Sequence, residues 1–273
     1  MIQDISPSRL DNSYKPRSLD RGDPLLCFDS EGRLLADISG GVIRFPTAGE
    51  ASAEKTVYAF SVDDTACFIA LSEHKCSGEG FEYYTVRELR DRAGGKELFA
   101  AFTAYHLWRW YADNNFCGRC GAALELHGTE RALKCPRCGN VIYPRINPAV
   151  IVGVTKGDSI LITRYRRGYA HNALVAGFTE IGETLEQTVA REVMEETGVR
   201  VKNIRYYKSQ PWGMAQDVLV GFFCEAEGDS EIHMDRNELK YAEWVRREDV
   251  VLQPNNFSLT NEMMRVFRDG LLP

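Results

Sequence analysis

The stretch "GFTEIGETLEQTVAREVMEETGV", residues 177–199, limits the possible folds of this chain more than any other. Its second half has helical periodicity and stops at Gly198, a residue type that commonly ends helices. On a helix over residues 185–197, Glu192, Glu195 and Glu196 lie on one face. Like charges at these spacings cost a helix roughly 0.2–0.5 kcal/mol per pair. A chain that keeps this arrangement needs positive charge beside it.

Divalent cations can supply that charge. The three glutamates span an arc of about 100° on a helical wheel, so their carboxylates point the same way. Oxygen ligands select hard metals, which predicts Mg²⁺ or Mn²⁺. Arg191 is spaced to pair with a neighbouring acid, and Glu183 stands near the positive amino end of the helix. The alternative is a solvated acidic face, which the register of glycines, arginine and glutamates makes a poor explanation.

Four of the eight cysteines form two tight pairs with the spacing Cys-x2-Cys, fourteen residues, Cys-x2-Cys. Four thiolates can close a tetrahedral shell around one zinc ion per chain, and such a shell leaves no open position for catalysis. The pattern therefore favours a structural zinc site over a nucleic-acid-binding or redox module. The predicted zinc ligands are Cys117, Cys120, Cys135 and Cys138.

Composition and charge restrict the class of protein. The chain has 273 residues, a hydrophobic fraction of 44% and a net charge of −6, so a broad basic surface for nucleic acid is not expected. Its amino-terminal residues lack the apolar core of a signal peptide. No stretch reaches the roughly 18 uninterrupted apolar residues of a membrane span. We expect a soluble, cytoplasmic protein without membrane contacts.

The order of motifs predicts an α+β protein with three parts. Residues 1–112 read as an N-terminal α+β domain with two strand–turn–strand patterns and a helix of about five turns over residues 97–114. Residues 113–144 hold the cysteines. Residues 145–273 read as a strand hairpin, the acidic helix, two more strands and a closing helix.

The acidic stretch satisfies G-x5-E-x7-R-E-U-x-E-E-x-G-U, with U apolar, at every position. It resembles the box of the Nudix hydrolases. The cysteine segment before it and "SQPW" at residues 209–212 are similar to the NADH pyrophosphatase (NAD diphosphatase) branch of that family. The resemblance implies a zinc ribbon followed by a Nudix α/β/α sandwich with a mixed sheet. It also implies cleavage of the pyrophosphate of NADH or NAD to nicotinamide mononucleotide and AMP, with removal of NAD caps from RNA as an associated activity.

The same resemblance implies roles for individual residues. The catalytic set would be Glu183, Arg191, Glu192, Glu195 and Glu196, with the general base left open between Glu195 and Glu196. The Mg²⁺ or Mn²⁺ ligands would be Glu192, Glu195, Glu196, the carbonyl of Ala176 and Glu238. The alternative for Glu238 taken by itself is a surface glutamate.

Substrate contacts also follow from the resemblance. Phe178 would stack on a base or nicotinamide ring, and Tyr143 would supply a second ring, which in the family comes from the partner subunit. Tyr143 could equally be a buried linker tyrosine, and the weak match at Arg87 is better explained by a surface arginine. The loop residues expected to line the pocket are Gln210, Pro211, Trp212 and Asp217.

That loop departs from the usual "SQPWPFPxS" of the branch, because this chain has "SQPWGMAQD". We expect Gly213 to loosen the loop and Asp217 to contact a ribose hydroxyl or a metal, since a carboxylate beside phosphate is unfavourable. Two alternatives remain: another nucleoside-diphosphate-X hydrolase, acting on ADP-ribose or diadenosine polyphosphates, and a non-catalytic zinc-ribbon regulator that binds nucleotide. A homodimer is expected from the resemblance alone.

Overall fold

The computed structural model describes residues 1–71, 76–166 and 171–272, and the chain divides into two compact units. The N-terminal unit comprises residues 2–145 and 212–216. The C-terminal unit comprises residues 146–211 and 217–273 together with Met1. The division into three domains drawn from the sequence stays a prediction.

The N-terminal unit begins with small sheets packed on two helices. One sheet has the order β1-β4-β5-β2, and strands β3 and β6 pair separately. The predicted long helix is confirmed as α2, and its buried face packs Trp108 on Phe28 with ring centroids 5.0 Å apart. The element bounds are β1 Leu10–Asp11, β2 Leu25–Leu26, β3 Leu34–Ala36, β4 Thr56–Val62, β5 Thr65–Ala70, β6 Glu82–Tyr84, α1 Val86–Arg92 and α2 Lys96–Asp113.

The cysteine segment follows α2 as a small antiparallel sheet of order β7-β8-β9. Its strands are β7 Glu125–Leu126, β8 Leu133–Lys134 and β9 Val141–Ile142. Each cysteine pair lies in a turn that ends at a glycine with φ of 72°, Gly121 or Gly139. The N–H groups of these glycines donate to the carbonyls of Cys117 and Cys135, respectively, at 2.8 and 3.0 Å. Such turns aim both thiols of a pair the same way.

The C-terminal unit is built on a six-stranded mixed sheet of order β13-β14-β10-β11-β15, with β12 paired to β10. Strand β10 runs parallel to β14 and antiparallel to β11 and β12. The predicted hairpin, strands and closing helix are all present. Their bounds are β10 Asn147–Lys156, β11 Ser159–Tyr165, β12 Val175–Phe178, α3 Leu185–Thr197, β13 Arg200–Trp212, β14 Asp217–Glu227, β15 Leu239–Arg246 and α4 Leu259–Arg268. Two short 3₁₀ helices, η1 Gly213–Ala215 and η2 Arg247–Asp249, complete them.

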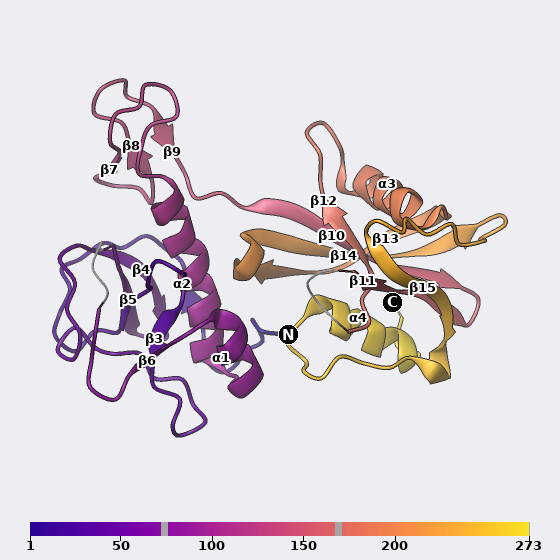
Figure 1. Cartoon of the computed structure of the whole chain (residues 1–273), viewed down its shortest axis with the longest axis horizontal. Helices are drawn as coiled ribbons and strands as arrows, with labels where there is room; N and C mark the ends of the chain where they lie inside the picture. Colours follow the sequence, from indigo (N-terminus) through magenta and orange to yellow (C-terminus); the bar gives the residue numbers. More distant parts are fainter. Residues whose placement is uncertain (72–75, 167–170, 273) are drawn as a thin grey trace. The chain divides into compact units, whose positions relative to one another are not determined.

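Helices α3 and α4 cover opposite faces of this sheet (Figure 1). Val150, Val152 and Val154 of β10 pack with Val189 and Val193 of α3 in one buried cluster. Residues between those valines face the other way, because side chains alternate along a strand. Gly153 accordingly lies against Phe223 and Met263, the latter from α4. The expected α/β/α sandwich is confirmed.

Helix α3 has the predicted bounds, and local interactions explain them. Thr184 and Gln187 form a capping box at its amino end. Gly198 ends the helix with φ of 71°, a left-handed conformation that favours glycine. The second half of residues 177–199 is therefore held as a helix that is capped at both ends. Across the described residues, no helix is long and apolar enough to span a membrane.

Candidate functional site

The acidic residues of α3 meet the backbone of β12 at Gly177. A Cβ atom built on Gly177 would lie 2.0 Å from the side-chain carbon Cδ of Glu192. Only glycine leaves room for this approach, so the Glu192 carboxylate rests directly against the strand. Glu196, four residues further along the helix, is buried with 2% of its surface exposed. Two of the predicted metal ligands are thus inside the fold and not splayed into solvent.

Arg191 reduces part of the repulsion that the sequence predicts among the glutamates of α3. Its guanidinium contacts three carboxylates: Glu183 at 2.6 Å, Glu192 at 2.8 Å and Glu195 at 3.0 Å. It also donates to the carbonyl of Phe178 at 3.0 Å. Hydrogen bonding from Arg191 lowers the pKa of Glu183 to about 2. Glu183 therefore orients Arg191, and Arg191 in turn fixes Glu192 and Glu195.

Glu196 has no such cation among the described residues. Burial raises its pKa to about 8, and the charges of Glu192 and Glu238 add to that effect. Burial also raises the pKa of Glu192, again with a contribution from Glu238. Glu238 is exposed just before β15. The structure brings these three predicted ligands into electrostatic contact from two separate parts of the chain.

This donor set fits a hard divalent cation. It consists of carboxylate oxygens and the backbone carbonyl of Ala176, which lies beside Glu196 through their common partner, the hydroxyl of Tyr165. Crowded, buried acids disfavour ionisation until a positive charge joins them. In the described part of the chain, however, the glutamate oxygens do not gather three together within 4.8 Å. Glu195 is exposed and is turned toward Arg191.

The four cysteines behave differently, because their ligand atoms all lie within 4.8 Å of one another. The Sγ atoms of Cys117 and Cys138 are 3.6 Å apart, and those of Cys120 and Cys135 are 3.5 Å apart. The N–H of Arg119 lowers the pKa of Cys117 to about 6. Although the Ala122 N–H favours the Cys120 thiolate, the neighbouring sulfurs raise the pKa of Cys120 to about 12. Four thiolates this close require a cation, and zinc fits them.

Predicted substrate residues are distributed over both units. Phe178 is half exposed at the end of β12 in the C-terminal unit. Tyr143 and Arg87 are exposed in the N-terminal unit, where the Tyr143 hydroxyl donates to Glu130 at 3.0 Å. Tyr143 is therefore not buried, so the linker explanation for it is wrong in that respect. Pro211 is exposed at the end of β13.

The "SQPW" loop is more tightly fixed than the sequence suggested. Trp212 packs edge-on against Phe102 of α2 at 5.2 Å. A Cβ atom on Gly213 would lie 2.0 Å from the Phe102 carbonyl oxygen. The expectation that Gly213 loosens this loop is therefore wrong, because the glycine allows close contact with the α2 backbone.

Gln210 and Asp217 lie on either side of that loop and both are buried. The Gln210 amide donates to the carbonyl of Phe257 at 2.8 Å and accepts from the N–H of Leu259 at 2.7 Å, so it fixes the start of α4. The Oδ1 atom of Asp217 has no hydrogen-bond partner among the described residues. Burial raises the pKa of Asp217 to about 7. Their predicted contacts with substrate stay predictions.

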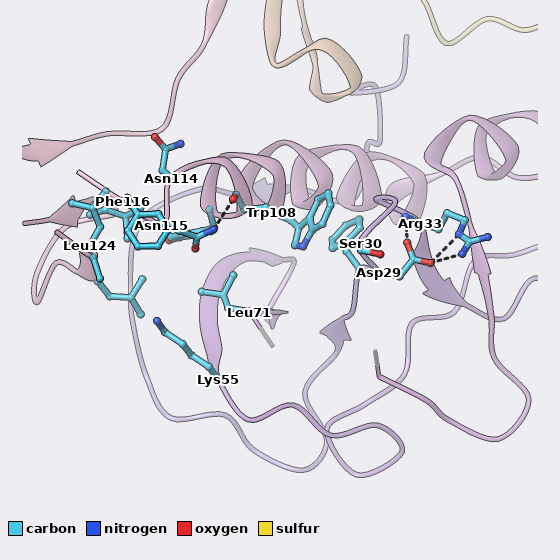
Figure 2. Close-up of a pocket in the computed structure, with 16 residues that line it drawn as sticks. Asp29, Ser30, Arg33, Lys55, Leu71, Trp108, Asn114, Asn115, Phe116 and Leu124 are labelled. Atoms are coloured by element: carbon cyan, nitrogen blue, oxygen red, sulfur yellow. Dashed lines mark hydrogen bonds and ion pairs between the residues drawn. The ribbon is translucent and has the colours of Figure 1, made fainter. Parts of the chain in front are cut away.

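A separate cavity of 690 Å³ lies within the N-terminal unit, between the first sheet, α2 and the cysteine segment. Figure 2 shows Trp108 lining it from α2, while the side chain of Lys55 extends toward Leu124. Asp29 and Arg33 form an ion pair of 2.7 Å on another side. The cavity contains none of the site residues predicted from the sequence.

Comparison with known proteins matches two families. The family described as "NUDIX domain" matches residues 145–267, and the "NADH pyrophosphatase zinc ribbon domain" matches residues 112–143. A crystal structure of a NUDIX hydrolase from Nitrosomonas europaea superposes with a TM-score of 0.50 at 23% identity, covering 57% of this chain and 91% of that one. That likeness supports the fold alone.

Curated relatives include proteins named NAD-capped RNA hydrolase NudC. The relative from Klebsiella pneumoniae subsp. pneumoniae is 44% identical over 173 residues, and that from Salmonella typhi is 42% identical over 172 residues. Each match covers 62% of this chain and 66% of the relative, just under two thirds of its length. Residues 145–267 of this chain therefore match the Nudix domain, and residues 112–143, which precede it, match the NADH pyrophosphatase zinc ribbon domain.

Proposed function

We propose that this protein hydrolyses the pyrophosphate bond of NADH or NAD, giving nicotinamide mononucleotide and AMP. The observation that carries the proposal is the pair of Glu196, which is buried, and Glu192, which is partly buried; both face the β12 backbone at Ala176 and Gly177. The complete motif and the ribbon family, whose description names NADH pyrophosphatase, support this choice of substrate.

In this proposal Glu192, Glu196, the Ala176 carbonyl and Glu238 hold Mg²⁺ or Mn²⁺, with Glu195 in support. The ion supplies positive charge to the phosphates and acidifies water. Arg191 keeps Glu192 and Glu195 in place through its contacts of 2.8 and 3.0 Å. The general base is Glu196 or Glu195, and the buried position of Glu196 beside Ala176 favours Glu196. The four cysteines hold zinc as a structural ion.

Substrate recognition is proposed to come from exposed aromatic rings. Phe178 and Tyr143 expose 51% and 58% of their surface, so both side chains are accessible for stacking on a base or nicotinamide ring. Pro211, Trp212 and Asp217 complete the proposed contacts, and Arg87 is proposed to meet phosphate. Gln210 contributes indirectly, through its bonds to the start of α4.

NAD-capped RNA is a second proposed substrate. Relatives that are 44% and 42% identical over 173 and 172 residues carry the name NAD-capped RNA hydrolase. In NAD-capped RNA the same pyrophosphate joins nicotinamide mononucleotide to the first adenosine of the chain, so we propose one site for both substrates. We further propose that the protein acts in the cytoplasm. We also propose that it is a homodimer, and light scattering would test this oligomeric state.

Product analysis tests the proposal. Purified protein with Mg²⁺ or Mn²⁺ is incubated in ¹⁸O water with NADH, NAD, NAD-capped RNA, ADP-ribose and diadenosine polyphosphates. We expect nicotinamide mononucleotide and AMP from NADH or NAD, no turnover in metal-free buffer, and one labelled phosphate that identifies the attacked phosphorus. Faster cleavage of ADP-ribose or diadenosine polyphosphates would show that this compound, and not NADH or NAD, is the preferred substrate. Nucleotide binding without turnover of any of these compounds would favour the regulator.

A further inference from the structure

Tyr165 lies at the end of β11, outside the glutamate motif of residues 177–199. Its hydroxyl contacts both elements that carry proposed metal ligands, helix α3 and strand β12. It accepts a hydrogen bond from the N–H of Ala176 at 3.1 Å. The same oxygen lies 3.1 and 3.3 Å from the two carboxylate oxygens of Glu196. It is also 3.4 Å from the Ala176 carbonyl oxygen.

A tyrosine hydroxyl has one proton to donate. Because the Ala176 N–H already donates to this oxygen, the proton is directed to an acceptor. The Glu196 oxygens, at 3.1 and 3.3 Å, are closer than the Ala176 carbonyl oxygen at 3.4 Å, and once a cation ionises Glu196 its carboxylate is the stronger acceptor. The proton therefore goes to Glu196, and the Ala176 carbonyl keeps its lone pairs for another partner.

Glu196 depends on this contact more than its neighbours do. Arg191 pairs with Glu183, Glu192 and Glu195, whereas Glu196 forms no ion pair within the described residues. Tyr165 is the one side chain seen donating to it in that part of the chain. Glu192 and Glu238 both repel it. The backbone N–H of Ala176 also favours the ionised Glu196 carboxylate, but without the Tyr165 hydroxyl this carboxylate loses its contact with β11.

We propose that Tyr165 is a positioning residue that holds Glu196 and the backbone of Ala176 in register for a divalent cation. The inference rests on the proposed function, since it concerns the same metal ligands. Tyr165 itself stays outside the ligand set, because its proton points at Glu196. Partners of metal ligands commonly change metal affinity or activity by about 10- to 100-fold when removed.

The chain offers a matched control. The hydroxyl of Tyr207 donates to Glu262 at 3.1 Å, the same contact at the same distance, on β13 and α4. Glu262 also pairs with Lys208 at 3.1 Å and with Arg265 at 2.7 Å, so it does not depend on its tyrosine. Tyr165→Phe and Tyr207→Phe each remove one oxygen and keep the ring.

The experiment measures Mn²⁺ binding to full-length, zinc-loaded protein without substrate, by electron paramagnetic resonance. We expect Tyr165→Phe to weaken Mn²⁺ binding by about tenfold or more, with the protein still folded by circular dichroism, and Tyr207→Phe to bind as the wild type does. In a Glu196→Gln background, Tyr165→Phe should add little, because the contact is already altered. Wild-type affinity in folded Tyr165→Phe would overturn the proposal.

Two further outcomes separate this inference from the proposed function. If the wild type neither binds Mn²⁺ nor cleaves any dinucleotide, both fail; if it does both and Tyr165→Phe is unchanged, only the positioning role fails. Should Tyr165→Phe not fold, NMR of the wild type replaces it. The Tyr165 hydroxyl proton should exchange slowly and shift on Mg²⁺ addition, unlike that of Tyr207. An unchanged Tyr165 resonance in Mg²⁺-binding protein would overturn the inference.

Discussion

The cysteine cluster of the N-terminal unit and the glutamate cluster of the C-terminal unit are opposite kinds of ligand site. The four thiols gather within 4.8 Å, and each pair is set by its own short turn. The glutamates do not gather as a trio at that distance among the described residues. One is buried, one rests on β12 and one is exposed toward Arg191.

The two sites differ in how repulsion between neighbouring ligand groups is limited before a metal ion binds. A thiol such as Cys120 can keep its proton beside other sulfurs, so the cysteine site is built by local turns and is completed by zinc. Carboxylates repel, so the protein holds them apart with a guanidinium and a tyrosine hydroxyl from other parts of the fold. A closed shell suits a structural ion, whereas separated, partly compensated carboxylates suit an ion that shares its coordination with substrate.

Loss of a zinc ligand should have the largest effect on the fold. Structural zinc binding is worth on the order of 10 kcal/mol in small zinc domains. Cys135→Ser should reduce bound zinc from about one ion per chain to almost none, and lower the melting temperature of the ribbon segment. Atomic absorption and thermal denaturation measure both. Cys67→Ser, in buried strand β5, is the control and should keep its zinc. An unchanged melting temperature after verified zinc loss would contradict the structural role.

Loss of Glu196 should instead remove activity and leave the fold. Glu196→Gln keeps the shape of a buried side chain but removes its charge, and we expect kcat to fall by about 10³-fold, equivalent to about 4 kcal/mol. Steady-state kinetics with NADH and circular dichroism measure the two effects. Glu186→Gln, an exposed acid in the first turn of the same helix, is the control. A fall of less than tenfold would argue against both roles proposed for Glu196.

Sequence reasoning recovered what local patterns encode. The bounds of α3 follow from its caps and from Gly198, and the cysteine spacing predicted four ligands that do lie together. The α/β/α sandwich followed from the family resemblance and from the order of strands and helices.

The remaining features depend on contacts between distant segments. Tyr165 is 31 residues from Glu196 in the chain and belongs to no motif, so only the pairing of β11 within the sheet reveals it. Gly213 read as a flexible residue because its neighbour, the Phe102 carbonyl, is more than a hundred positions away. The burial of Gln210 likewise depends on its contact with the start of α4, which is 49 residues away in the chain. A single sequence carries no signal for such pairs.

Asp217 differs from the glutamates of α3, because it is a buried acid of the C-terminal unit whose Oδ1 atom has no hydrogen-bond partner among the described residues. Burial raises its pKa from 3.8 to about 7. Between those values the folded state binds more protons than the unfolded state, so this group lowers the free energy of unfolding as pH rises from about 4 to 7. The full span corresponds to at most about 4 kcal/mol.

Asp217→Asn removes that pH dependence. Urea denaturation should find the variant close to wild type at about pH 3.5, below both pKa values, and more stable than wild type at pH 8. Asp64→Asn, in the exposed turn between β4 and β5, is the control and should shift neither value. A variant that is less stable than wild type at pH 8 would indicate that the Asp217 charge is compensated.

Arg191 provides the smallest and most direct test of the comparison, because it does for the glutamates part of what zinc does for the thiols. Arg191→Gln leaves three carboxylates without their cation, and we expect the free energy of unfolding to fall by about 1–3 kcal/mol in metal-free protein. Arg109→Gln, which removes one exposed pair with Asp113, should cost no more than about 0.5 kcal/mol. Adding Mg²⁺ should then raise the melting temperature of Arg191→Gln more than that of the wild type, because the ion replaces the lost charge. Equal shifts in both proteins would mean that the arginine and the divalent ion act on different acids, and the parallel with the cysteine site would fail.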